Sequence, residues 1–416
     1  MSLTARPNRS RVLLIAVLGA SVPGALITWD LGSALSSVDY ILRTWHLLTV
    51  AAQVLFAIHV FTAPRGSLPR QGLSPVQAGL LVAVFAYVLA QIVLRGGIVV
   101  YFSGIGWLVD VVFFAALAVW RPGHAEQVDK IWLGLGLIAL AHMMIFAASL
   151  YILRDVPDYP WIQRPPGFTN IRHLAYLSAP AAAAVSVYFL IRHQNAALAL
   201  LCYVGAVYFL LVSGARGGLV GMIAGIAITV GLLRVFRVPI LRGRLVVLVL
   251  VSLVLVPATE PVRGYSFDTI IERFIDNVDA NFKNLDTARI ETWQAAYQLF
   301  LDNWLWGTGP VPLQFLAEDP PLAGKNHPHN FILQMLHQWG LPGTLLICAA
   351  ASVFLLQARL ADTQSIADKA PTIAIVSCML THGLIDGGLF YPFSVAIFLV
   401  AFADLTRPKP SGGGSL

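Results

Sequence analysis

The sequence has 416 residues, of which 57% are hydrophobic and only 12% are charged. A soluble domain carries about twice that share of charged residues, so this chain cannot cover itself with polar side chains, and a soluble globular protein is excluded. Its 27 Lys and Arg outnumber its 21 Asp and Glu, but they form no dense basic run. The excess therefore indicates membrane topology rather than nucleic-acid binding.

Apolar windows of roughly 17–25 residues predict transmembrane helices. We place twelve, near residues 12–28, 44–63, 75–94, 102–120, 131–152, 173–191, 196–213, 217–233, 245–257, 330–357, 371–385 and 388–405. The first follows basic residues as a signal peptide would, but so many spans follow that we interpret it as an uncleaved helix. The last two are short, so a single re-entrant hairpin is the alternative for them. We expect an all-α polytopic membrane protein.

Basic residues predict which side of the membrane each connection occupies. With the N-terminal arginines in the cytoplasm, alternation places most basic residues of the short loops inside, and both termini are cytoplasmic. The arginines on the inner side include Arg234, Arg237, Arg242 and Arg244. The chain then divides into spans one to nine at 1–257, an outer loop at 258–329, spans ten to twelve at 330–405 and a flexible tail at 406–416.

The outer loop is too long to lack structure, and its pattern predicts two amphipathic helices. The first, over 269–278, begins with the capping-box residues Thr269 and Glu272. The second starts near Asp286 or Thr287 and ends at Gly-Thr-Gly-Pro, 307–310. Its apolar positions recur at helical spacing: Ile290, Trp293, Tyr297, Phe300, Leu301 and Trp304. Such helices lie in the membrane interface or cap a cavity, and a packed lid without chemistry is the alternative.

Three histidines stand where the chain enters the tenth span. His327 and His329 precede the span and face the outer side, whereas His337 lies two turns inside it. His327 and His329 have the spacing of a metal-binding pair, but the sequence shows no carboxylate cluster to complete a site. We interpret His337 as a packed, hydrogen-bonded residue.

Two arginines share the outer side with these histidines. Arg216 lies at the turn between the seventh and eighth spans, among glycines that allow a ligand to approach the backbone, and Arg289 lies in the first turn of the second loop helix. A guanidinium group suits a phosphate, and a helix N-terminus adds a favourable dipole. A snorkelling arginine and a local ion pair are the respective alternatives. Together with a neutral imidazole, they suit deprotonation of a hydroxyl while an anionic group leaves.

The stretch HNFILQMLHQWGLPG, beginning at His329, resembles the signature of the O-antigen ligase and polymerase superfamily. The stretch ARIETWQAAYQLFLDNWLWGTGP, around Arg289, is similar to that family's preceding loop segment, and SGARGGLVG is similar to its Ser-x-x-Arg-Gly turn. RPPGFTNIRHLAY is similar to a further segment, with Asn170 as its asparagine. The family often has an acidic residue before the helix glycine, where this chain has His337 and Gln338.

That resemblance implies a GT-C-type glycosyltransferase of the bacterial inner membrane. It would pass a polysaccharide from undecaprenyl diphosphate to an acceptor on the periplasmic face, and in the ligase branch the acceptor is a sugar hydroxyl of lipid A-core. His329 would be the base, and Arg216 and Arg289 would bind the diphosphate. The secondary candidates are Asn330, His327, His337, Asn170 and Arg164. We expect an inverting, metal-independent reaction without a cofactor, and as partners the lipid-linked donor, the lipid A-core acceptor and membrane lipids, but no nucleic acid.

Other functions fit parts of the same pattern. An O-antigen polymerase and a protein O-oligosaccharyltransferase would share the superfamily's motifs. A polytopic transporter or flippase would also have many spans, and it would be expected to show internal repeats and intramembrane ionisable groups. Only Asp110 and Asp386 are acidic candidates of that kind, and no repeat is visible. The ligase is therefore the preferred interpretation.

Overall fold

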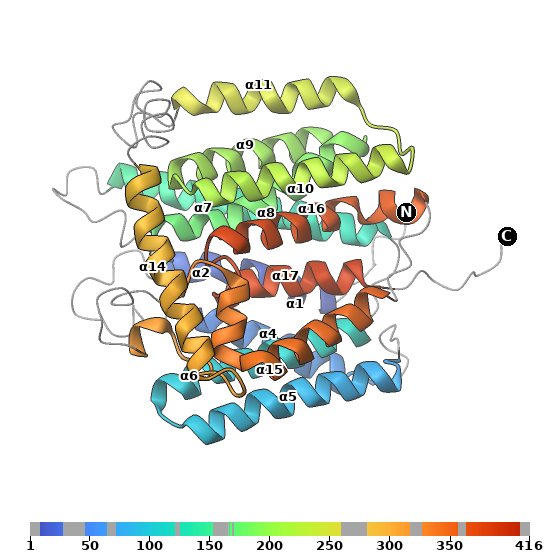
Figure 1. The fold of residues 1–416 in the computed structure, drawn as a ribbon. Coiled ribbons are helices and arrows are strands. Elements are labelled where there is room, and N and C mark those ends of the chain that lie inside the picture. The colour runs from blue at the N-terminus through green and yellow to red at the C-terminus, as the bar shows by residue number, and fades with distance from the viewer. Residues whose placement is uncertain are drawn as a thin grey trace.

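A computed structural model describes residues 9–27, 46–64, 72–120, 125–152, 165, 167–168, 170–258, 281–316, 327–356 and 363–407. Over these residues the secondary structure is helical, without strands (Figure 1). The first predicted loop helix, over 269–278, and the candidate Arg164 fall outside them. The helices are α1 (Arg9–Gly19), α2 (Ser21–Ile27), α4 (Leu47–Thr62), α5 (Pro75–Arg95), α6 (Ile98–Val119), α7 (Ala125–Ile152), η2 (Ile171–His173), α8 (Leu174–Ile191), α9 (Ala196–Ser213), α10 (Arg216–Val235), α11 (Arg242–Ala258), α14 (Asn281–Asp302), η3 (Leu313–Phe315), α15 (Phe331–Leu356), α16 (Thr363–Ile385) and α17 (Pro392–Leu405).

Each predicted span coincides with a helix, and the first coincides with the pair α1 and α2. Among the described helices, seven are long and apolar enough to cross a membrane: α5, α6, the part of α7 at Asp129–Ser149, α8, α9, α10 and α15. The chain is therefore a multi-pass membrane protein, and the count of twelve spans remains a prediction. The alternative of a hairpin for the last two spans loses support, because α16 begins at Thr363 rather than near 371 and has 23 residues.

The helices of the bundle run alongside one another, whereas α14 runs across their ends (Figure 1). At the end opposite α14, Arg192 follows α8 and pairs with Asp129 of α7 at 2.9 Å, and Arg244 at the start of α11 donates to the Arg192 carbonyl at 2.6 Å. At the α14 end, Trp293 of α14 donates to the Pro328 carbonyl at 2.8 Å. These connections thus alternate between two ends as the topology predicts, and which end is cytoplasmic remains a prediction.

Small residues let the central helices approach one another closely. Nearly all of α8 is buried, including its run of alanines at 181–184, and α8 packs against α7, α9, α10 and α16. On α10, Gly217, Gly221 and Gly225 form one row that faces α16. A Cβ at Gly221 would come within 2.8 Å of the Cys378 carbonyl oxygen. Contact through glycines spaced four apart is a common means of helix association in membranes.

The helix α15 is kinked at Gly340, and the kink holds the loop that follows α14. Gly340 has φ +62°, which a glycine adopts without strain. The loop replaces the missing helical bonds: the amides of Thr308 and Gly309 donate to the carbonyls of His337 (2.7 Å) and Gln338 (2.9 Å). In return, the amide that follows Gly340 donates to the carbonyl of Trp304 at 2.7 Å. Two sequence motifs, Gly-Thr-Gly-Pro and Gly-Leu-Pro-Gly, therefore form one joint.

The glycine row predicts unequal effects of two substitutions on the same helix. We expect Gly221→Ala to destabilise the protein by about 1–3 kcal/mol, because the added methyl group forces α10 and α16 apart. Gly231→Ala is the control: nothing lies within 4 Å of its Cβ position, so only the better helix propensity of alanine, up to about 1 kcal/mol, should act. Thermal unfolding in detergent measures both variants. Equal melting temperatures of the two variants would show that the glycine row is not needed for the packing of α10 against α16.

Candidate functional site

The His327–Asn330 segment forms a tight turn at the start of α15. His329 has φ +56°, and its amide donates to Nδ1 of His327 at 3.3 Å. Asn330 caps the helix: its Oδ1 accepts hydrogen bonds from the amides of Ile332 (3.0 Å) and Leu333 (3.1 Å). Its Nδ2 donates to the Leu384 carbonyl near the end of α16 at 3.0 Å. The asparagine of the His-Asn pair therefore holds His329 against α16.

His327 is buried beneath this turn. Its ring occupies the space above Gly387, where any Cβ would overlap it, and lies 4.4 Å from the His329 ring and 5.2 Å from the Phe390 ring between centroids. Burial lowers the pKa of His327 well below its usual range, because the charged form loses its hydration. His327 is thus neutral, and its Nδ1 serves as an acceptor.

The partner of His329 is Asp386, directly after α16. Its Oδ1 lies 2.8 Å from His329 Nδ1, and it also accepts from the Tyr176 hydroxyl at 3.1 Å and the Gly387 amide at 2.7 Å. Oδ2 lies 3.7 Å from Nε2 of His382, one turn earlier on α16. Burial by itself would raise the pKa of Asp386, but the bond with His329 and the nearby His382 ring together hold it well below the usual range.

This geometry sets the tautomer of His329. An ionised carboxylate can only accept, so the proton of His329 belongs on Nδ1, and its Nε2 is left as an acceptor. The side chain of His329 is 35% exposed, whereas that of Asp386 is 9% exposed. The arrangement is that of a base oriented by a buried acid.

Aromatic rings form the wall behind the carboxylate. The Tyr176 ring stacks on His173 and Tyr391 with centroids 5.2 and 5.7 Å apart, and lies 5.2 Å from the His382 ring. Each ring comes from a different segment: η2, α8, α16 and the residue before α17. The wall therefore keeps the Tyr176 hydroxyl aimed at Asp386.

Both predicted arginines are placed at this end of the bundle. Arg216 is the exposed first residue of α10, and the next residue, Gly217, packs against His382 and Asp386, with a Cβ position 3.4 Å from Cβ of Asp386. Arg289 is half-buried on α14, one turn before Trp293, which binds the Pro328 carbonyl of the histidine turn. Residues one turn apart share a helix face, so Arg289 lies on the face of α14 that meets that turn.

Residues 198–348 match the family model described as O-antigen ligase. Over this segment, the chain is similar to the O-antigen ligase family. No curated protein matches the sequence. The matched segment extends from α9 into α15 and includes Arg216, Arg289 and His329, whereas Asp386 lies beyond it. The resemblance noted in the sequence is thereby confirmed over this segment.

Two expectations about the matched segment were wrong. The helix α14 begins at Asn281, not near Asp286, so Arg289 lies in its third turn and gains nothing from the helix N-terminus. It is Arg216 that begins a helix. The glycines after Arg216 were expected to admit a ligand, but Gly217 and Gly218 instead pack on His382 and Leu210. Only Gly214, with φ +61° at the end of α9, remains a turn residue.

The secondary candidates have mainly structural contacts. His337 is buried, and its carbonyl accepts from the amide of Thr308 in the joint with α14. Asn170 begins η2: its Oδ1 accepts from the Arg172 amide at 2.9 Å. Within the part of the chain that the structure describes, no group of three or more His, Cys, Asp or Glu side chains is placed to hold a metal ion.

Sequence reasoning missed the role of Asp386, which it had weighed only as an intramembrane acid. The signal was present as Asp-Gly-Gly at the end of an apolar run, preceded one turn earlier by His382. A carboxylate at a helix C-terminus opposes the helix dipole, so it needs donors from elsewhere. Nothing local shows that His329, 57 residues away, supplies one.

The buried state of His327 predicts a pH dependence of stability. Its folded pKa lies below the unfolded value of about 6.5, so the unfolded state binds more protons and stability falls as the pH is lowered through that value. His327→Asn keeps an acceptor for the His329 amide but cannot be protonated. We expect its melting temperature to fall less than that of the wild type on acidification. If the melting temperatures of the variant and the wild type changed equally with pH, His327 would not take up a proton on unfolding.

Proposed function

We propose that this chain is an O-antigen ligase of the bacterial inner membrane, with its site on the periplasmic face. It transfers a polysaccharide from undecaprenyl diphosphate to a sugar hydroxyl of lipid A-core. The observation that carries the proposal is the His329–Asp386 pair, 2.8 Å apart, in a chain whose residues 198–348 match the O-antigen ligase family model. Arg216 and Arg289 lie at the same end of the bundle. A base oriented by an acid and a cationic surface for a leaving diphosphate are the two requirements of this transfer.

His329 acts as the base. Its Nε2 accepts the proton of the acceptor hydroxyl as that oxygen attacks the anomeric carbon of the donor. The bond between this carbon and the diphosphate oxygen breaks, and undecaprenyl diphosphate leaves with the electron pair. Asp386 stabilises the imidazolium that forms, because its carboxylate already accepts from Nδ1. Release of the proton to water follows from the partial exposure of the His329 ring.

Arg216 and Arg289 bind the diphosphate. A guanidinium group offers several donors in a plane and stays charged at all relevant pH values, so two of them stabilise the negative charge that develops on the leaving group. They thereby replace a divalent cation in this role. One displacement at the anomeric carbon inverts its configuration. Retained configuration in the product would contradict this step, and loss of transfer with a chelator would contradict its independence of metal.

The base and its acid partner make the first functional prediction. We expect His329→Ala to lower the transfer rate by about 10²–10⁴-fold, the usual contribution of a general base. Asp386→Asn should reduce kcat with a smaller effect on the KM for the donor, because the amide leaves His329 in the wrong tautomer. His193→Ala, an exposed histidine after α8, is the control and should transfer normally. Near-normal transfer by His329→Ala in reconstituted protein would exclude it as the base.

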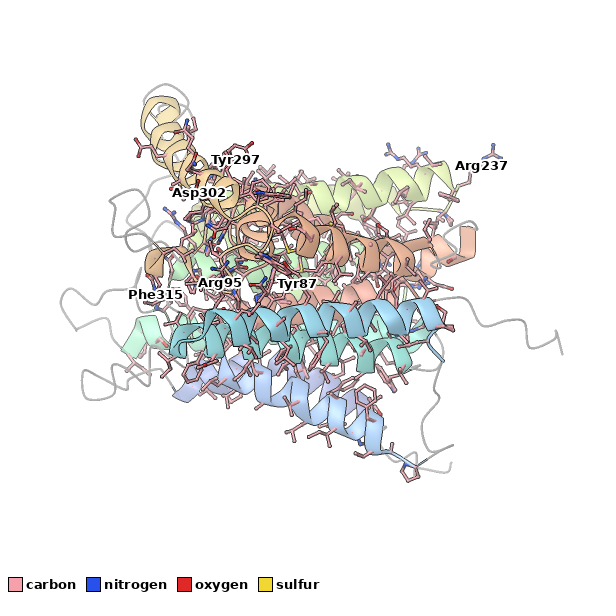
Figure 2. All side chains as sticks on the ribbon, turned by 60° about the horizontal axis from the view of Figure 1, so that its bottom comes forward. Tyr87, Arg95, Arg237, Tyr297, Asp302 and Phe315 are labelled. Carbon is pink, nitrogen blue, oxygen red and sulfur yellow. The ribbon has the colours of Figure 1, made fainter. Side chains whose placement is uncertain are left out.

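The second functional prediction concerns the two arginines. We expect Arg216→Ala and Arg289→Ala each to lower kcat/KM by about 10-fold or more, because each removes a charge-assisted contact worth about 1.5–3 kcal/mol. Lysine at either position should restore part of the loss, since charge is kept while the paired donors are not. Arg237→Ala, at the far end of the bundle in Figure 2, is the matched control. Unchanged kcat/KM in both alanine variants would remove the diphosphate site.

The acceptor that receives the glycan distinguishes a ligase from a polymerase and from a protein oligosaccharyltransferase. Purified protein in vesicles, given lipid-linked glycan and lipopolysaccharide without O-antigen, should produce a larger lipopolysaccharide band. A ladder of longer undecaprenyl products would indicate a polymerase, and glycan on a protein would indicate an oligosaccharyltransferase. A transporter loses support because Asp386 is engaged by His329, and Asp110 by the Gln53 amide at 2.7 Å. Movement of the lipid across vesicles without transfer would restore it.

A further inference from the structure

The helix α14 exposes a stripe of large apolar side chains. Ile290, Tyr297 and Leu301 are 44–49% exposed, and their spacing of seven and four residues places them along one side of the helix. The exposed side chains Trp304, Leu305 and Trp306 continue the stripe in the turn beyond the helix end at Asp302. An exposed apolar stripe on a helix outside the spans needs an occupant that covers it.

The other two faces of α14 differ from the stripe: one is buried against the protein and one is polar. Thr292 and Ala296 are buried against the protein, at 1% and 0% exposure. On the opposite flank, the exposed residues are polar: Glu291, Gln294, Gln298 and Asp302. The apolar stripe lies between the buried face and the polar row, so α14 has three distinct faces. That division is what a helix at a membrane surface requires, with one side on protein, one in lipid and one in water.

The position of α14 matches this division. It runs across the ends of the membrane helices rather than alongside them, which places it parallel to the membrane plane (Figure 1). Figure 2 shows Tyr297 and Asp302 on α14 at the end of the bundle where Arg95 terminates α5. The Trp306 ring stacks on Tyr87 of α5 with centroids 6.3 Å apart, so the end of the stripe contacts α5.

The stripe is continuous with the surface that faces lipid. Where α5 ends and α6 begins, Val93, Leu94 and Ile98 are 70–71% exposed, as expected for side chains in contact with acyl chains. Tyrosine and tryptophan are enriched where acyl chains meet headgroups, and the stripe supplies one tyrosine and two tryptophans at that level. Continuity and composition favour lipid over a second protein as the occupant.

We propose that the stripe of α14 is a lipid-binding surface that sits at the boundary between headgroups and acyl chains of the outer leaflet. Because the Trp304 carbonyl binds the α15 kink and Trp293 binds Pro328, lipid contact also sets the height of Arg289 and the histidine turn above the membrane. The surface does not depend on the transfer chemistry.

Spin labels in vesicles test this surface directly. The labels replace Tyr297 and Leu301 on the stripe, and Gln298 and Asp302 on the polar row serve as matched controls. All variants carry Cys348→Ala, which removes the exposed thiol. In vesicles of phosphatidylethanolamine and phosphatidylglycerol, we expect stripe labels to show a severalfold higher ratio of oxygen to nickel-chelate accessibility than the controls. Equal ratios would overturn the proposal, as would labels shielded from both reagents, which would indicate a second copy.

A second measurement avoids cysteine substitutions. Brominated phospholipids quench tryptophans near the acyl chains, so Trp304→Phe combined with Trp306→Phe should lower the quenched share of the fluorescence. Trp132→Phe, a fully buried tryptophan of α7, is the control and should leave that share unchanged or raised. An unchanged quenched share in the double variant would contradict lipid contact even if the labelled variants failed to fold.

Discussion

A single carboxylate at the end of α16 connects the parts of this protein that matter for its site. Asp386 stands where the helix dipole disfavours negative charge and where little water reaches it, so it requires donors. They come from α8, from the residue after Asp386 and from the turn that begins α15, through Tyr176, Gly387 and His329. Satisfying one buried charge thus fixes three segments relative to one another and orients the exposed imidazole.

That convergence depends on small side chains. Gly217 allows α10 to pass directly beside His382 and Asp386, and Gly387 leaves room for the His327 ring. In lipid, helices gain little from burying apolar surface against each other, so close contact between backbones carries much of their association. The glycines therefore shape the site through packing, and Gly217 brings the start of α10 next to His382 and Asp386.

Contacts with the α15 kink and with the histidine turn hold α14 in place, and by our proposal lipid contact holds it as well. The loop after it supplies hydrogen bonds that the kink at Gly340 leaves open, and Trp293 binds the histidine turn. Arg289 lies between these contacts and the start of the helix. On our proposals, a helix held in this way keeps Arg289 at a constant height above the membrane, where it would meet a lipid-linked substrate.

The helices and their alternation between two ends can be predicted from the sequence, because hydropathy and helical period are local properties of each segment. It also selected His329, Arg216 and Arg289, since the parity of the spans places their positions at one end. The contact between Asp386 and His329 and the contact between Gly307 and Gly340 become visible only in the folded chain. Such pairs are distant in sequence, and no periodic pattern encodes which helices will touch. Their contacts follow from how glycines and buried polar groups let the helices pack.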